Sequence, residues 1–290
     1  MNHLKKFIDS ASIKYNANQD HMSEVNQTID YALTRLKQYA NYALFGKYSG
    51  KSSVDYNAFS CDGVTSRPIR PDLFISDPNE FNVVFSVLKH KIKNNLSSCS
   101  DADRVDANKV IYTAVMSVAC CFDLWQSGSR KTPGTFFEIF IAALLKVIIK
   151  SGEFSKHIPL ECDGEKTSVS TDIVIKGNGG SAVIPLKITT RERIVQPFAQ
   201  QRILDSFFGE GVYQSFIACI SETQQDKNNS KVNHICVPGT IILYQKHLSS
   251  ISGLYYCDIP ERYLENDLTS IIPVKSMGDF IFDIYDFISN

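Results

Sequence analysis

Two charged residues in apolar stretches have the types and spacing of a phosphodiester-cleaving site. Asp172 begins the run DIVI, and Lys187 lies in the run PLKI. Hydrolysis of a phosphodiester needs an activated water and stabilised charge at phosphorus and at the leaving oxygen, which a metal ion held by carboxylates and a lysine can supply. In a hairpin site of this kind, Leu186 would add its backbone carbonyl as a metal ligand. The alternative is that both charged side chains face solvent from half-exposed strands.

A β-hairpin would bring the two side chains together. Residues 171–176 (TDIVIK) and 181–189 (SAVIPLKIT) are strand-like, and the sequence GNGG at 177–180 is a tight-turn signal. Asp172 and Lys187 are fifteen residues apart, which is short enough for two paired strands. We therefore expect them to reach one site from neighbouring strands.

A charged triplet, Arg191-Glu192-Arg193, follows this hairpin. The guanidinium fork of an arginine can donate to O6 and N7 of guanine, and a carboxylate can accept from the N4 amino group of cytosine. The triplet could thus read adjacent G and C bases in the major groove. The alternative is a salt-bridged turn on the protein surface.

Together, the hairpin and the triplet resemble the catalytic and recognition region of PD-(D/E)XK type II restriction endonucleases. They are most similar to the branch that reads CCGG or CCNGG targets, in which an Arg-(Asp/Glu)-Arg triplet follows the catalytic lysine by a fixed interval. Arg191 lies four residues after Lys187, as that pattern requires. The resemblance is specific from Glu138 to Asp205.

This resemblance implies a biochemical function and a set of partners. It implies Mg²⁺-dependent double-strand cleavage of DNA at a palindromic site by a homodimer, in which each subunit reads half of the site. A cognate DNA methyltransferase is expected in the same host. The bases outside the CC/GG core are not predicted.

The sequence departs from the family pattern at two positions. The residue two before the lysine is commonly acidic, but here it is Pro185. In the CCGG branch a helix supplies that acid thirteen residues after the lysine, and here that residue is Gln200. Three explanations stay open: Gln200 coordinates the metal or holds water, Glu138 compensates, or the enzyme is weakened.

Glu138 lies in the apolar run TFFEIFIAALL, where a carboxylate is costly unless it binds a partner or a metal ion. The family often has a glutamate in the helix before the catalytic hairpin, and Glu138 matches that position. The alternative is a first-turn glutamate favoured by the helix dipole. Arg130 and Lys131, just before this helix, would contact phosphates or be solvated loop charges.

The expected catalytic residues are therefore Asp172, Lys187, Glu138 and Gln200. The expected metal ligands are Asp172, Leu186 and Glu138, and the expected DNA-binding residues are Arg191, Glu192, Arg193, Arg130 and Lys131.

The pattern of apolar residues predicts an α/β chain. The expected helices span residues 21–47, 79–96, 103–125, 135–150, 197–208 and 277–289. Strands are expected at 171–176, 181–189, 212–220, 232–237, 240–244 and 253–257, and a loop at 51–70. We expect a restriction-endonuclease-like core with a central mixed β-sheet flanked by helices and preceded by a helical N-terminal region. The expected division is a mainly helical region at 1–70 and a nuclease and DNA-recognition domain at 71–290.

Composition limits the class of protein without identifying it. The chain has 290 residues, of which 43% are hydrophobic, and its net charge is −1, so DNA binding must depend on local placement of Lys and Arg. The eight cysteines show no zinc spacing, and adjacent Cys120 and Cys121 are poorly placed for a disulfide, so we expect reduced thiols in the cytoplasm. The N-terminus lacks the apolar run of a signal peptide, and the longest apolar stretch, 136–149, is too short and polar to span a membrane.

Two other functions are compatible with the sequence. The changes at Pro185 and Gln200 would suit a DNA-binding relative that does not cut. A structural pairing of Asp172 with Lys187 would suit an α/β scaffold protein without enzymatic activity.

Overall fold

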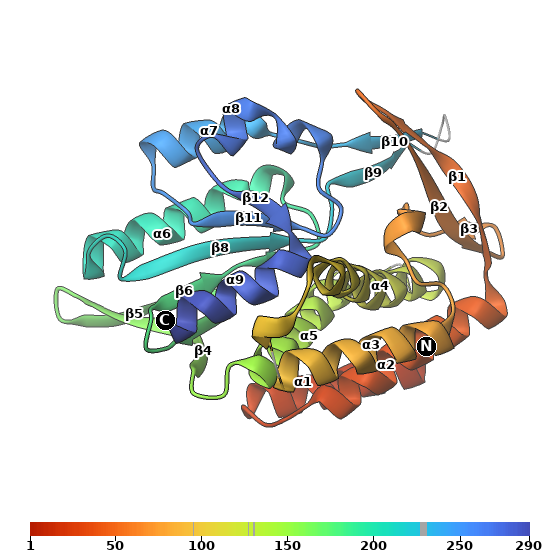
Figure 1. The fold of residues 1–290 in the computed structure, drawn as a ribbon, viewed down its shortest axis with the longest axis horizontal. Coiled ribbons are helices and arrows are strands. Elements are labelled where there is room, and N and C mark those ends of the chain that lie inside the picture. Colours follow the sequence, from red (N-terminus) through yellow and green to blue (C-terminus); the bar gives the residue numbers. More distant parts are fainter. Residues whose placement is uncertain (95, 127, 130, 227–230) are drawn as a thin grey trace.

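The chain folds around a mixed β-sheet with helices against both faces (Figure 1). This computed structural model describes residues 1–94, 96–126, 128–129, 131–226 and 231–290. The α/β class with a mixed sheet flanked by helices, expected from the sequence, is confirmed.

Among the described residues the central sheet has the strand order β12-β11-β8-β6-β5-β4, with β7 paired to β8. The strands β4, β5 and β6 are antiparallel neighbours, whereas β6, β8, β11 and β12 run parallel to one another. Their bounds are β4 (Glu153–Cys162), β5 (Glu165–Lys176), β6 (Ser181–Ile184), β7 (Leu186–Lys187), β8 (Tyr213–Cys219), β11 (Gly253–Tyr256) and β12 (Val274–Ser276).

Helices cover both faces of this sheet, and the alternation of side chains along β5 shows it. Ile173 and Ile175 join the large core under α4, α5 and α9, whereas Val174 between them packs on the other side with Leu204 of α6. A strand buried on both faces reads as a continuous apolar run, as DIVI does. The helices on the first side are α4 (Asp101–Trp125), α5 (Thr132–Ile148) and α9 (Met277–Ser289), and those on the other are α6 (Val195–Phe208), α7 (Pro238–His247) and α8 (Asn266–Thr269).

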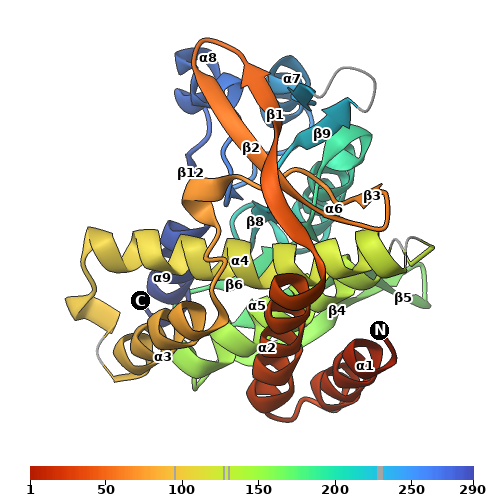
Figure 2. The same ribbon diagram turned by 90° about the vertical axis from the view of Figure 1, so that its right-hand side faces the viewer.

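The first helices form an outer layer. In Figures 1 and 2, α1 (Asn2–Asn16), α2 (Met22–Tyr39) and α3 (Pro78–Asn94) lie against α4 and α5 on the side away from the sheet. Their apolar faces share one hydrophobic core with α4, α5 and α9. The expected division near residue 70 stays a prediction.

The two central helices have clear local causes. Pro133 lies in the first turn of α5, where its missing amide hydrogen costs nothing, and apolar residues on nearly all faces bury the rest of the helix. Ser100 and Asp103 form a capping box at the start of α4. Within the described residues α4 is the helix long and apolar enough to cross a membrane, but 83% of its apolar window is buried inside the protein, as in a core helix.

A second sheet lies beside the first and was not expected from the sequence. Among the described residues its order is β3-β2-β1-β10-β9. Its strands are β1 (Asn41–Ser49), β2 (Ser53–Cys61), β3 (Val64–Thr65), β9 (Thr223–Asp226) and β10 (Lys231–His234). The expected helix at 21–47 therefore ends at Tyr39, and the expected loop at 51–70 contains strands.

The physical reason is long-range pairing. β1 pairs in parallel with β10 through Lys47 and Lys231, almost two hundred residues later, and local periodicity carries no trace of that partner. In β2, Tyr56, Ala58 and Phe59 are buried, but Asp55 and Asn57 give the strand the composition of a loop.

Other expected strands also need correction. Residues 240–244 (TIILY), expected as a strand from their β-branched composition, lie in α7, where Pro238 starts the helix and Ile241 is buried in the core on that face of the sheet. Strand β4 was not expected, because only its second half shows buried alternation. The expected strand at 181–189 is interrupted at Pro185.

We predict that Gly278 holds α9 against α4. A Cβ added at Gly278 would lie 1.9 Å from the backbone oxygen of Arg104, so Gly278→Ala must push the two helices apart. The free energy of unfolding should fall by about 1–3 kcal/mol. Urea denaturation checks it, with Gly239→Ala in α7 as the control.

No atom lies within 4 Å of a Cβ added at Gly239, so that change should be neutral or stabilise by up to about 1 kcal/mol. Equal unfolding midpoints for the two variants would contradict close packing at Gly278.

Candidate active site

Pro185 lies where the hairpin ladder ends. β5 and β6 pair from Lys176 with Ser181 to Ile173 with Ile184, and the regular ladder stops there. Proline has no amide hydrogen, so Pro185 can only accept a hydrogen bond from a neighbouring strand. Its carbonyl accepts from Ala218 of β8 at 3.0 Å. β6 and β7 both pair with β8, so the chain leaves the β5 ladder after Ile184 but stays beside β8 through Lys187.

The Asp172 side chain accepts two hydrogen bonds where the β5–β6 ladder ends. Its Oδ2 receives the amide of Leu186 at 2.6 Å and the Nζ of Lys187 at 3.0 Å. The side chains of Lys187 and Asp172 are 15% and 20% exposed, so the ion pair is mostly shielded from water but still open on one side. The structure brings Asp172 and Lys187 together, as the hairpin spacing predicted, while their roles stay predictions.

Glu138 reaches the same place from α5. Burial, together with the negative charge of Asp172, raises the pKa of the Glu138 carboxyl to about 7, and the ammonium groups of Lys156 and Lys187 act in the opposite direction. Lys156 Nζ lies 3.8 Å from Glu138 Oε2. Two carboxyl groups held together in a partly buried place repel each other when both are ionised.

Such a pair suits a divalent cation. Among the described residues no group of three His, Cys, Asp or Glu side chains could hold a metal ion. The candidate donors at this place are those expected from the sequence, namely Asp172, Glu138 and the backbone carbonyl of Leu186, and all three residues line the same cleft. Magnesium is commonly bound by one or two carboxylates with water completing its shell. The donor set therefore fits Mg²⁺ and does not fit a zinc site of Cys and His.

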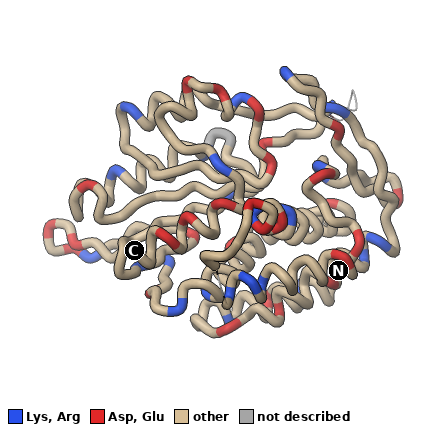
Figure 3. Tube along the Cα trace, in the orientation of Figure 1, with Lys and Arg blue, Asp and Glu red and all other residues tan. Residues whose placement is uncertain are grey.

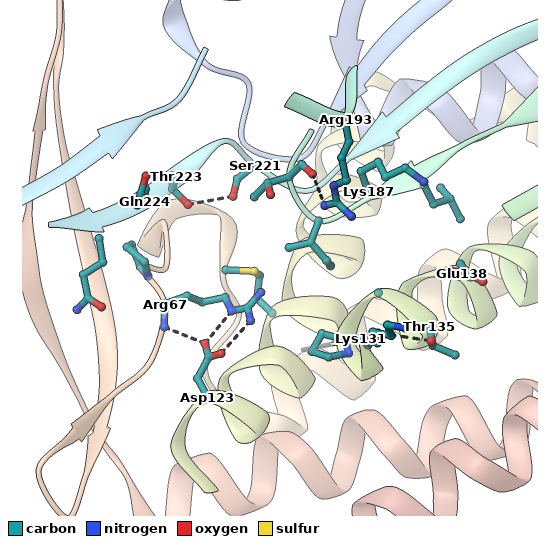
Figure 4. A pocket seen from close by; sticks show the side chains of 18 of the residues that line it. Arg67, Asp123, Lys131, Thr135, Glu138, Lys187, Arg193, Ser221, Thr223 and Gln224 are labelled. Atoms are coloured by element: carbon teal, nitrogen blue, oxygen red, sulfur yellow. Dashed lines mark hydrogen bonds and ion pairs between the residues drawn. The ribbon is translucent and has the colours of Figure 1, made fainter. Parts of the chain in front are cut away.

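These residues line an open cleft of about 900 Å³ between the central sheet, α5 and the second sheet. In Figure 4, Glu138 comes from α5 and Lys131 from the residue directly before it, while Lys187 comes from β7 and Arg193 from the residues that follow β7. The facing wall carries Arg67, Thr223 and Gln224. The cleft therefore joins the expected catalytic residues to a wall from the second sheet.

Gln200 lies elsewhere. Its amide Nε2 donates to the carbonyl of Ser170 at 2.6 Å, and it is absent from the described residues that line the cleft. Its neighbour Gln201 is buried and bonds to Asp205 and to the Tyr213 carbonyl. Of the two candidates for the second acidic position, Glu138 is the one beside Asp172.

The expected DNA-binding residues are placed in part. Residues 191–194 form a short 3-10 turn, η3 (Arg191–Ile194), shortly after β7. Arg193 lines the cleft, and its guanidinium donates to the Thr189 carbonyl at 3.1 Å. The side chains of Arg191 and Glu192, and the whole of Arg130, lie outside the described residues.

Several residues of the cleft had no signal in the sequence. Arg67 binds Asp123 through its backbone amide, Nε and NH2 at 2.7–2.9 Å, although the two are 56 residues apart. Lys156, which is near Glu138 but is not among the described residues that line the cleft, lies on β4, a strand that was not expected. Thr223, Gln224 and Gln225 enter through β9, whose partners come from the second sheet.

The charge on the molecule is mixed. Basic and acidic positions are interspersed over the trace in Figure 3, in keeping with the net charge of −1. Attraction of a polyanion therefore depends on the local basic side chains of the cleft, which are Arg67, Lys131, Lys187 and Arg193.

Comparison with known proteins gives one extensive similarity. No protein-family model matches the chain, and no curated protein matches it. Among solved structures, the chain is similar to the type IIP restriction endonuclease Kpn2I, with 59% identity over 99% of this chain and 98% of that chain and a TM-score of 0.93. The restriction endonuclease PspGI, in a complex with substrate DNA, has 13% identity over 72% of this chain and 92% of that chain, with a TM-score of 0.42.

We predict that the Arg67–Asp123 pair fastens the facing wall of the cleft to the end of α4. The side chains are 28% and 25% exposed, so Asp123→Ala leaves a half-buried guanidinium and a backbone amide without their acceptor. The free energy of unfolding should fall by about 1–3 kcal/mol. Urea denaturation measures the loss.

The control is the exposed pair Lys47–Asp55, with side chains 59% and 51% exposed. Asp55→Ala should change stability by less than about 0.5 kcal/mol. If both variants unfold at the same urea concentration, the wall is held by other contacts.

Proposed function

The chain belongs to the type IIP restriction endonucleases, and we propose that it is a PD-(D/E)XK nuclease that makes Mg²⁺-dependent double-strand breaks at a palindromic site with a CCGG or CCNGG core. Family membership makes it a site-specific nuclease that acts on DNA. One observation carries the catalytic assignment: the Asp172 carboxylate receives both the Leu186 amide and the Lys187 ammonium group in a cleft that Glu138 also lines.

Asp172, Glu138 and the carbonyl of Leu186 are the residues that would hold Mg²⁺. When bound, the ion supplies positive charge at the phosphate and makes a water easier to deprotonate. Lys187 lies beside the same carboxylate, so its ammonium group can orient the attacking water and neutralise charge on the phosphate. The Asp172 ion pair fixes the direction of that ammonium group.

Glu138 is better supported than Gln200 as the second acidic ligand. Glu138 interacts with Asp172, whereas the Gln200 amide is engaged by the Ser170 carbonyl. In this assignment Gln200 supports the backbone of β5 two residues before Asp172. The loss of acidic residues at 185 and 200 is then compensated by α5.

Sequence recognition is assigned to Arg191, Glu192 and Arg193. They follow the catalytic segment directly, so they would meet bases next to the scissile phosphate. Arg130 and Lys131, at the start of α5, are assigned to phosphate contacts, which position the duplex without reading it.

A palindromic site implies a homodimer in which each subunit cuts one strand. A cognate methyltransferase would protect the host's own sites, and both enzymes would work in the cytoplasm. We assign cleavage and recognition to residues 71–290 and a supporting role to residues 1–70. That support is direct at Tyr15 of α1, whose hydroxyl donates to the Asp172 carbonyl at 3.1 Å.

Of the two other functions considered, family membership excludes the scaffold protein. The relative that binds without cutting is tested by incubating the purified protein with Mg²⁺ and plasmids of known sequence. Discrete fragments are expected, and their ends map the site. A shifted duplex that stays intact would overturn the proposed reaction.

We predict that Lys187→Ala and Asp172→Ala lower the cleavage rate by about 100-fold or more, because each removes half of the catalytic pair. Binding to the mapped site in Ca²⁺ should stay close to that of the wild type for Lys187→Ala. Single-turnover cleavage and a gel shift give the two readings.

Lys176→Ala is the matched control, because Lys176 lies on the same hairpin but at its turn, and it should cut normally. Wild-type cutting by the Lys187→Ala protein would remove the lysine from the mechanism.

We predict different results at the two candidate acidic positions. Glu138→Ala should slow cleavage by about 100-fold or more and raise the Mg²⁺ concentration needed for half-maximal rate, because it removes a ligand. Gln200→Ala should cut within about tenfold of the wild type, because it removes a hydrogen bond of about 1 kcal/mol. Cleavage rates across a Mg²⁺ titration compare them.

Gln200→Glu should also retain activity. If Gln200→Ala loses more activity than Glu138→Ala, Gln200 occupies the acidic position after all.

We predict that Arg191→Ala and Arg193→Ala each reduce the preference for the mapped site over a scrambled duplex. A base-reading contact contributes about 1–3 kcal/mol of discrimination, and a dimer contains two copies. Binding to the scrambled duplex should change far less, because it depends on phosphate contacts and salt. Titrations of both duplexes in Ca²⁺ at one salt concentration give the ratio. Equal losses on the two duplexes would assign these arginines to phosphates.

A further inference from the structure

A buried carboxylate with no role in the proposed chemistry lies directly after β8. Glu222 is 2% exposed. Its side chain accepts the backbone amide of Thr190 at 2.9 Å and the hydroxyl of Tyr256 at 3.0 Å, and it also accepts the hydroxyl of Thr190. A buried charge is costly unless such donors surround it, and hydrogen bonds to an ionised acceptor are strong.

Together with two backbone hydrogen bonds, these contacts hold residues 187–190, which begin with the proposed catalytic lysine, against the residues that follow β8. The amide of Ile220 donates to the carbonyl of Lys187 at 3.1 Å, and the amide of Ser221 donates to the carbonyl of Ile188 at 3.1 Å. The next link runs in the other direction, from the Thr190 amide to the Glu222 side chain. The backbone from the catalytic lysine to Thr190 is thus held step by step, and the last step depends on one side chain.

Thr190 directly precedes the turn η3, which we call the recognition turn because it carries the proposed base-reading residues 191–193. Its carbonyl accepts the amide of Arg193 at 2.9 Å, and the Thr189 carbonyl accepts the Arg193 guanidinium at 3.1 Å. A rotation of Thr190 would therefore move the whole turn η3 relative to Lys187. Glu222 fixes Thr190 against that rotation.

The same residue also contacts the facing wall of the cleft. The backbone carbonyl of Glu222 accepts the amide of Ile235 at 2.9 Å, and Thr223 of β9 follows it directly. Glu222 thus ties the recognition turn through its side chain and the second sheet through its backbone.

We propose that Glu222 is a positioning residue for DNA recognition: its carboxylate holds Thr190 so that residues 191–193 meet the bases while Lys187 meets the scissile phosphate. This inference rests on the proposed function. In this role Glu222 does not contact DNA. It acts because its side chain is long enough to place an acceptor oxygen at the Thr190 amide, and this length is what we call its reach.

Two conservative changes separate reach from charge. Glu222→Gln keeps the length and one acceptor oxygen, so it can still receive the Thr190 amide. Glu222→Asp keeps the charge but is shorter by one methylene and withdraws the acceptor. A positioning role requires the first variant to retain recognition and the second to lose it.

The experiment measures the dissociation constants of two duplexes in Ca²⁺ at one salt concentration: one carries the mapped cleavage site and the other a scrambled sequence. Glu222→Ala and Glu222→Asp should lower the ratio of affinities about tenfold or more, the size of a lost base contact. Glu222→Gln should change it less than about threefold, and all three should bind the scrambled duplex as the wild type does.

The matched control is Asp103→Ala. Asp103 is also buried, at 6% exposed, but it caps α4 at the end far from the cleft and pairs with Lys91. Thermal unfolding is recorded for every variant. Asp103→Ala should lose stability and keep the affinity ratio, which separates recognition from general destabilisation.

The outcomes are distinct. A wild type with no preference for its site would refute the proposed function itself. A wild type with that preference, beside Glu222→Ala and Glu222→Asp proteins that keep it, would overturn the positioning role alone. Loss in Glu222→Gln but not in Glu222→Asp would also overturn it, because charge would then matter instead of reach. Should Glu222→Ala fail to fold, the Gln and Asp variants still decide.

Discussion

The structure depends on how the Asp172 carboxylate replaces a broken β-ladder. Regular pairing of β5 with β6 ends at Ile184, whereas β6 and β7 both stay paired with β8. Asp172 then accepts the Leu186 amide, in place of a strand partner, and the Lys187 ammonium group. The end of the hairpin thus forms a site in which a carboxylate and a lysine are paired beside an open cleft.

The position of the residues that follow Lys187 depends on the continued pairing of this segment with β8. The carbonyls of Lys187 and Ile188 accept amides from the segment after β8, and Glu222 then takes the amide of Thr190. The proposed catalytic and recognition residues therefore share one short, continuously bonded piece of backbone. A shift of one requires a shift of the other, which is a direct way for a site-specific nuclease to couple reading with cutting.

The sequence by itself determined the parts whose signals are local. The apolar run in TDIVIK, the GNGG turn and the interval to Lys187 predicted a hairpin that joins Asp172 to the lysine, because pairing across a short turn leaves few other registers. The continuous apolar face of 135–150 predicted a buried helix that carries Glu138. The position of the triplet 191–193 close to the end of the hairpin could be predicted from chain order alone, because the triplet begins four residues after Lys187.

Only the tertiary structure decided what depends on partners distant along the chain. The second sheet requires β1 to lie beside β10, a pairing between distant parts of the chain. The composition of β2 is typical of a loop, so the sequence alone did not predict this strand. Which of Glu138 and Gln200 lies beside Asp172 depended on the packing of α5 and α6, and spacing from the lysine cannot report packing. Glu222 had no signal, because an isolated glutamate after a strand reads as solvated. Glu222 is buried and contacts Thr190 only because the chain around β8 and β11 encloses it. That packing joins residues distant along the chain, so local periodicity could not identify Glu222.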